Sequence, residues 1–417
     1  MRCNTLKVNV WIVFSAILFA RVAHGQILAK DSIAPINQIV NATSMAPFFK
    51  ALKNRDKQKV HILHLGDSHI QMGYLSERLR LKMDSLYRID DFGATFLYQI
   101  AKHNTFYTRA KANIGKWSWA SILNDKTAIK SGFSGFWVNT RDTIASLQFA
   151  LRQQEREKEN FSRVSIFFKS DAMCTINLRG YNMQDSSVKI SPISSTETEF
   201  DGYNGRWRKL EIVFSEQVNS LLIEINNPIP VLGFTLYGLS LENAEESGLM
   251  YSACGVGGAQ FKHFAQNSLI ALEQIKELSP DLLIFSYGSN ESYTNSFTAE
   301  AYGNMLHDLV QKIRQQMPHV SILFTGPPDT RSHNIYPRNA NAIAQVLTEV
   351  AFTENCAFWD LRKQMGGENS IYQWLQKGLA AKDQLHFTKK GYYLQAEWLS
   401  EAINNAYELV NQSKKNE

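Results

Sequence analysis

The chain has 417 residues, of which 44% are hydrophobic and 20% charged; this is typical of a folded globular protein and excludes a largely disordered one. A chain of this length predicts one large domain or two ordinary ones. The formal charge of +5 includes Arg2, Lys7 and Arg21, so the chain without its first 25 residues carries 5 − 3 = +2. This near-neutral balance, without a long basic run, gives no indication of nucleic-acid binding.

The first 25 residues predict a secretory signal peptide. A basic start is followed by an apolar stretch, residues 8–20, that is too short to span a bilayer comfortably. Ala23 and Gly25 supply the small side chains that a signal peptidase needs, and cleavage is expected before Gln26. We therefore expect a secreted protein of the bacterial periplasm, without stable membrane insertion after cleavage. The alternative is an uncleaved N-terminal anchor.

Residues 26–57 predict an N-terminal leader with an amphipathic stretch. The first strand is predicted at 59–65, where a near-continuous apolar run ends at Gly66, and a helix follows at 73–87. Unbroken apolar strands are typical of a parallel sheet that is covered on both faces. Downstream, helices and strands are predicted in turn at 262–278, 281–287, 299–317, 320–325, 337–354, 357–361 and 389–412. This alternation predicts an α/β fold.

Between these two parts the hydrophobic period changes to two. Short alternating segments are bounded by Asn, Asp, Gly and Ser, at 164–169, 174–181, 188–192, 207–214, 221–226 and 232–241. Such segments predict an inserted all-β sandwich, jelly-roll-like, instead of further βαβ units. The expected domains are a first part of the α/β domain at 58–135, the inserted β-sandwich at 136–245 and the second part of the α/β domain at 246–412.

Ser68 is the first candidate for chemistry. It lies in Gly66-Asp67-Ser68-His69, where a parallel strand ends and a helix begins, which is the place where open α/β sheets put their active residues. The N–H of a serine at a helix start can also hold an oxyanion. The alternative is an ordinary turn with a helix cap, which the same tripeptide forms well.

A nucleophilic serine needs a base, and the base needs a group that orients it. Asp383-Gln384-Leu385-His386 supplies both, because a carboxylate three residues before a histidine can meet the imidazole across one turn. The alternative is a surface loop before the last helix.

Two further segments offer donors for an oxyanion. Gly258 lies in a glycine-rich turn before a predicted helix, where backbone N–H groups are free. Asn290 follows the strand predicted at 281–287, so its amide also lies at a carboxyl edge of the sheet. Each of them, taken alone, is better explained by an ordinary turn or helix cap.

The order of these segments resembles the SGNH, or GDSL-type, hydrolase family, whose motif residues match here at Ser68, Gly258, Asn290, Asp383 and His386. The resemblance covers roughly 58–110 and 246–412. It implies a flavodoxin-like three-layer α/β/α domain and esterase activity by a Ser-His-Asp mechanism. Ser68, Gly258 and Asn290 would form the oxyanion hole, and no metal or organic cofactor is implied.

The closer similarity is to the peptidoglycan O-acetylesterase branch, through 64–69, the glycine turn and 378–392. Members of that branch carry a β-sandwich similar to a carbohydrate-binding module at the place of residues 136–245. This chain departs from the branch at Gly257, where Asn is frequent. The resemblance implies an acetylated glycan as substrate, peptidoglycan first. Another acetylated polysaccharide such as xylan, O-acetyl transfer, and glycan binding without catalysis remain as alternatives.

Several other residues have structural explanations. His61 and His64 point to opposite faces of a strand, so they cannot easily share a metal ion, and both are expected in the core or at an edge of the sheet. His69 is expected to line the pocket. The cysteines after the predicted cleavage point match no metal spacing and require no disulfide. Trp117 and Trp119 are spaced for one face of an extended segment, where they would contact glycan or pack in the core.

Overall fold

The computed structural model describes residues 37–413, except 125–128, 153–159, 171–172, 183–184, 203–204, 230 and 232. The predicted signal peptide, together with residues 26–36 of the leader, lies outside this part of the chain. Among the described residues, no helix combines the length and the apolar character that crossing a membrane requires.

Seven strands of the described chain form the central sheet, in the order β1-β19-β18-β17-β2-β16-β3. All neighbours are parallel except β1, which runs antiparallel to β19. Without the short edges β1 and β3, the order β16-β2-β17-β18-β19 is 2-1-3-4-5 in chain order, the flavodoxin-like arrangement. The strands are β1 (Ile39–Val40), β2 (Lys59–Gly66), β3 (Ile89–Asp91), β16 (Gly248–Gly255), β17 (Leu282–Ser286), β18 (Ser321–Thr325) and β19 (Ala357–Trp359).

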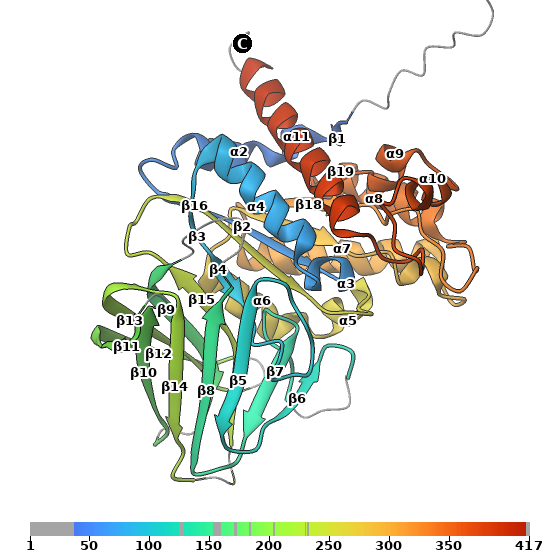
Figure 1. The fold of residues 1–417 in the computed structure, drawn as a ribbon. Helices are drawn as coiled ribbons and strands as arrows, with labels where there is room; N and C mark the ends of the chain where they lie inside the picture. The colour runs from blue at the N-terminus through green and yellow to red at the C-terminus, as the bar shows by residue number, and fades with distance from the viewer. Residues whose placement is uncertain are drawn as a thin grey trace, which may run out of the picture. The chain divides into compact units, whose positions relative to one another are not determined.

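Helices cover both faces of this sheet (Figure 1). Along β2, Val60 and Ile62 belong to the apolar cluster on one face, and Leu63 and Leu65 belong to the cluster on the other. The first face packs against α2 (Ala46–Lys53), α4 (Tyr74–Tyr87), α9 (Leu361–Met365), α10 (Ser370–Gln376) and α11 (Lys389–Ser413). The second packs against α5 (Phe261–Gln266), α6 (Ser268–Leu278), α7 (Ala299–Gln316) and α8 (Ala340–Thr353). The predicted three-layer α/β/α arrangement is therefore confirmed.

The remaining strands form two antiparallel sheets, which confirms the predicted all-β insert. One sheet contains β5 (Thr108–Ile114), β8 (Ile144–Leu151), β10 (Thr175–Asn182), β11 (Asp185–Ile190) and β14 (Ser220–Asn226). The other contains β4 (Gly93–Thr95), β6 (Ser118–Ser121), β7 (Phe136–Thr140), β9 (Phe161–Lys169), β12 (Pro192–Phe200), β13 (Trp207–Val218) and β15 (Phe234–Glu242). Because β4, β5 and β6 precede residue 136, we propose a boundary for the insert near Gly93.

Two predicted elements differ in the structure. The helix expected at 262–278 is divided at Asn267, which ends α5 and precedes α6. Its side-chain amide donates to the His263 carbonyl at 2.9 Å, and its backbone N–H is shared between the His263 and Phe264 carbonyls. No strand was expected before the glycine-rich turn, but Gly248–Gly255 forms the buried strand β16, paired with β2 along its whole length. The turn itself follows at 256–260.

Part of the expected leader belongs to the α/β domain. Strand β1 pairs with β19, the 3-10 helix η1 (Ala42–Met45) follows, and α2 buries Phe48, Phe49 and Leu52 in the first apolar cluster. The Phe48 N–H also donates to Ser321 Oγ at the start of β18, at 3.2 Å.

Candidate active site

Ser68 is the first residue of α3 (Ser68–Gln71), directly after the carboxyl end of β2. The chain turns sharply there because position 66 is glycine: a Cβ on Gly66 would lie 2.4 Å from Ile70 Cγ1 and 2.7 Å from the Ser286 carbonyl. Asp67 caps the short helix, since its Oδ1 accepts from the His69 N–H at 2.9 Å. These contacts fix the direction of the serine at the edge of the sheet.

The structure brings Ser68, His386 and Asp383 together as one hydrogen-bonded chain. Ser68 Oγ lies 3.1 Å from His386 Nε2, and His386 Nδ1 lies 2.8 Å from Asp383 Oδ2. The loop that carries the pair is short and closed, because the Ala381 N–H donates to the His386 carbonyl at 2.9 Å. This geometry allows the imidazole to take the serine proton while the carboxylate holds the ring in place.

Asp383 is held in its charged form. Partial burial by itself would raise its pKa, but hydrogen bonds from the His386 side chain and from the N–H groups of His386 and Leu385 outweigh this and lower the pKa. Both N–H groups donate to Asp383 Oδ1, at 2.9 and 3.0 Å. Since Oδ2 remains for the imidazole, one carboxylate both shapes the loop and orients the base.

The glycine turn after β16 faces the serine. A Cβ placed on Gly257 would lie 3.8 Å from Ser68 Cβ, and the Gly257 N–H donates to Gln71 Oε1 at 2.7 Å. Gly258 has a φ of +82°, and no described residue accepts a hydrogen bond from its N–H. The Ser68 N–H likewise has no acceptor within the described chain. The donors left for an oxyanion are therefore those of Ser68 and Gly258, whereas that of Gly257 is occupied.

Asn290 lies in the turn after β17, at the N-terminus of the 3-10 helix η2 (Glu291–Tyr293). Its Nδ2 donates to the Ala259 carbonyl at 2.9 Å and lies 3.5 Å from Asp67 Oδ2. The first bond is normal and the second is at the limit of a hydrogen bond, so one amide hydrogen is weakly engaged. The bond to Ala259 ties the asparagine to the glycine turn.

Two buried carboxyl groups support these turns and were not among the candidates. Burial raises the pKa of Asp67, and that of Glu291, to about 7 in each case, although backbone N–H groups oppose the shift. Glu291 accepts from the Phe261 N–H at 2.6 Å and from the Gly288 N–H at 3.1 Å, and so joins the turn of Asn290 to the start of α5. Asp67 stands next to a motif serine and could have been suspected; Glu291 gives no sequence signal beyond its position after Asn290.

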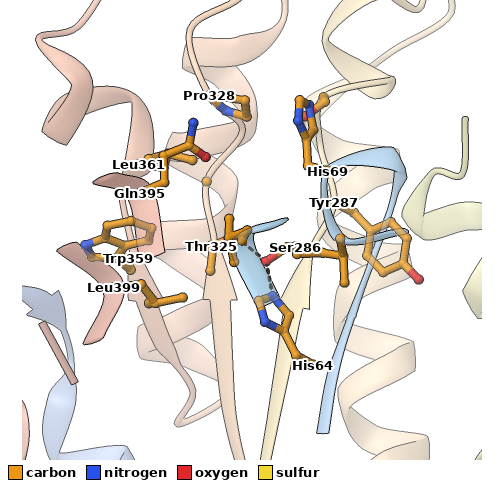
Figure 2. A pocket seen from close by; sticks show the side chains of 14 residues that line it. His64, His69, Ser286, Tyr287, Thr325, Pro328, Trp359, Leu361, Gln395 and Leu399 are labelled. Carbon is orange, nitrogen blue, oxygen red and sulfur yellow. Dashed lines mark hydrogen bonds between the residues drawn. The ribbon is translucent and has the colours of Figure 1, made fainter. Parts of the chain in front are cut away.

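The histidines of β2 occupy the core, as expected. His64 Nε2 lies 2.6 Å from Ser286 Oγ, which in turn accepts from Thr325 Oγ1 at 2.8 Å; Figure 2 shows this chain of side chains across three neighbouring strands. His61 binds the Leu278 carbonyl and Ser252 Oγ instead. Burial lowers the pKa of His64 to about 3 and that of His61 to about 4, so both rings are neutral in the fold.

His69 lines the same small cavity of about 30 Å³ as His64 (Figure 2). Its Nδ1 lies 3.0 Å from Tyr392 Oη, and its ring centroid lies 5.6 Å from that of His386. Burial lowers the pKa of His69 to about 3, so it packs beside the base as a neutral ring. Within the described chain no group of three His, Cys, Asp or Glu side chains could hold a metal ion, and Cys174, Cys254 and Cys356 are all buried.

Residues 239–394 match the family of GDSL-like Lipase/Acylhydrolase proteins. This part of the chain is similar to the GDSL-like acylhydrolases. It contains the turns of Gly258 and Asn290 as well as the loop of Asp383 and His386, whereas Ser68 lies before it and is placed beside them by the fold.

One solved structure has the same fold as most of this chain. It is described as a peptidoglycan O-acetylesterase in action, is 22% identical, covers 90% of this chain and 99% of that chain, and has a TM-score of 0.69. A lipase/acylhydrolase from Enterococcus faecalis is 20% identical over 39% of this chain and 77% of that chain, with a TM-score of 0.30. An acetyl xylan esterase is 18% identical over 37% of this chain and 80% of that chain, also with a TM-score of 0.30. A comparison with curated proteins gave no match.

Proposed function

We propose that the chain is a secreted serine esterase that removes O-acetyl groups from cell-wall carbohydrate, with peptidoglycan as the first candidate substrate. The observation that carries the proposal is the chain of hydrogen bonds from Ser68 through His386 to Asp383. The GDSL-like match supports the ester chemistry. The structure that aligns with 90% of the chain is that of a peptidoglycan O-acetylesterase, which supports the substrate. The first 25 residues support secretion.

In the proposed mechanism, Ser68 Oγ attacks the acetyl carbonyl carbon while His386 Nε2 takes the hydroxyl proton. The carbonyl oxygen becomes an oxyanion, which the N–H groups of Ser68 and Gly258 and the Asn290 amide stabilise. The bond from carbon to the sugar oxygen then breaks, and His386 returns the proton to the leaving alcohol. Water attacks the acetyl-enzyme by the same route, and acetate and free Ser68 are the products.

The direct test replaces the nucleophile. Ser68→Ala should lower kcat on a chromogenic acetyl ester and on O-acetylated peptidoglycan by roughly 10⁴-fold or more, because no other group forms the acyl-enzyme. Its fold should persist, since Asp67 Oδ1 and not the serine hydroxyl caps α3. Intact-protein mass spectrometry should find an acetyl group on the wild type only. Acetate release that survives in the variant would refute the proposal.

The substrate is tested separately from the chemistry. Mass spectrometry of purified muropeptides before and after treatment should show the loss of acetyl groups, and acetylated xylan serves as the competing substrate. Faster release of acetate from xylan than from peptidoglycan would indicate that the substrate is another polysaccharide. Acetyl groups that appear on an added acceptor glycan would indicate transfer in place of hydrolysis.

A further inference from the structure

The β-insert forms part of the wall of the active site. A Cβ on Gly258 would lie 3.7 Å from Leu123 Cδ1, which follows β6. A Cβ on Gly135, directly before β7, would lie 2.5 Å from Val256 Cγ2. The turn with the free Gly258 N–H therefore packs directly against the β6–β7 edge of the insert.

A continuous series of contacts leads from the nucleophile to one tryptophan of β6. Gln71 binds the Gly257 N–H at 2.7 Å, and its Nε2 lies 3.4 Å from His103 Nδ1. The His103 ring meets the Trp119 ring edge-to-face, with centroids 5.2 Å apart. Gly257 is itself next to Ser68, so the side chains of Gln71 and His103 connect the glycine turn beside the serine to Trp119.

The surface at this edge is apolar and open. Leu123, beside the Gly258 turn, is 43% exposed although its side chain is large and apolar. Trp119 is only partly buried. Exposed apolar side chains beside polar catalytic groups are typical of a binding site. A flat indole suits the C–H face of a pyranose ring, while the hydroxyl groups of the sugar stay in water.

We propose that Trp119, with Leu123, forms a platform on which the sugar ring of the substrate stacks during deacetylation. The platform would favour acetyl esters on glycans over small acetyl esters, and it would make the insert a part of the substrate site. The proposal rests on the proposed esterase function of Ser68. Stacking lies on the leaving-alcohol side of the reaction, so it contributes to binding the glycan and not to the acyl transfer itself.

Trp117 provides a matched control on the same strand segment. Although it is only two residues away, its indole donates to the Ile114 carbonyl at 3.2 Å. It also lines a different cavity, together with Ser118, Trp137 and Asn139. The two tryptophans therefore have different surroundings, and only Trp119 contacts a residue that leads to the glycine turn.

The test compares kcat/KM for O-acetylated glycan fragments with kcat/KM for a chromogenic acetyl ester. In Trp119→Ala the ratio of glycan to small ester should fall at least tenfold, mainly through KM for the glycan, and Trp119→Phe should restore most of it. Trp117→Ala should leave the ratio as in the wild type. Circular dichroism checks that each variant is folded.

Three results would overturn the platform. The ratio could stay constant in Trp119→Ala, it could fall instead in Trp117→Ala, or both substrates could lose activity equally in a folded Trp119→Ala protein. None of these resembles a failure of the esterase proposal, in which the wild type itself would turn over neither substrate.

Discussion

Three carboxyl groups around the candidate site have different surroundings and correspondingly different pKa values. Asp383 lies at an exposed position, where hydrogen bonds from His386 and Leu385 lower its pKa. Asp67 and Glu291 are buried, and desolvation raises the pKa of each to about 7. Environments that separate carboxyl pKa values are a recurring mark of acid–base sites. Here the separation leaves Asp383 as the anion beside the imidazole and gives the two buried groups a supporting role.

Glu291 should make stability depend on pH. A pKa raised from 4.5 to about 7 contributes stability that is fully present below pH 4.5 and is lost as the pH rises through about 7. In Glu291→Gln the new side chain does not titrate. Its NH2 group would face the N–H of either Phe261 or Gly288, so that two donors meet. The wild type should therefore be more stable than the variant at low pH, and this advantage should decline by roughly 3 kcal/mol up to about pH 8. Urea unfolding across this pH range measures the difference.

The control for this measurement is Glu300→Gln, which changes an exposed carboxyl in the first turn of α7. Its stability should follow the wild type at every pH. Asp67 titrates in all three proteins, so its contribution cancels from the differences to first order. If the stability advantage of the wild type over Glu291→Gln grew with pH instead, Glu291 would be anionic in the folded protein. The two N–H donors would then lower its pKa by more than desolvation raises it.

At the scale of elements, α2 should be required for folding although it lies in the expected leader. Phe48 is fully buried against the central sheet. Phe48→Ala should cost about 3–5 kcal/mol, as for other buried phenylalanines, whereas Lys50→Ala on the exposed side of α2 should cost less than about 0.5 kcal/mol. Thermal unfolding of the two variants gives the comparison. Similar melting temperatures for both would show that α2 is an independent leader.

The sequence predicts elements well where packing is uniform along them. Strands β2, β17 and β18 have unbroken apolar runs, since helices cover both faces, and the structure has them within a residue or two of the expected bounds. Strand β16 was not predicted because Gly248–Gly255 includes Gly, Ser, Ala and Cys, which have little strand preference. Its pairing with β2 and β3 decides the conformation there, and that pairing is not visible in a local pattern.

The same distinction holds for the candidate site. Ser68, Asn290 and the Asp383–His386 pair could be named because each follows a recognisable strand end or motif. Gln71 and His103 could not, because their importance comes from contacts across 32 and 186 residues of chain, to each other and to Gly257. Side chains that position other groups leave no spacing of their own in a sequence.

For the molecule as a whole, the insert and the hydrolase part share one apolar cluster. It runs from Leu63 and Leu65 of β2 to β9 and β15 of the insert. Polar contacts cross the same boundary: the Phe133 N–H donates to Gln274 Oε1 at 3.0 Å, and Trp207 Nε1 donates to Glu273 Oε2 at 3.1 Å. A continuous core of this kind predicts that both parts unfold together instead of as separate domains.

Gln274 on α6 tests this cooperativity. Gln274→Ala leaves the buried Phe133 N–H of the insert without an acceptor, which should cost about 1–3 kcal/mol. Because the lost bond joins the two parts, the cost should shift one common transition, seen equally by calorimetry, far-UV circular dichroism and tryptophan fluorescence. Lys276→Ala, exposed on the same helix, should leave that transition in place. If the change splits the melting curve, or moves the fluorescence transition but not the dichroism, the insert folds as a unit of its own and the shared core does not couple it to the hydrolase.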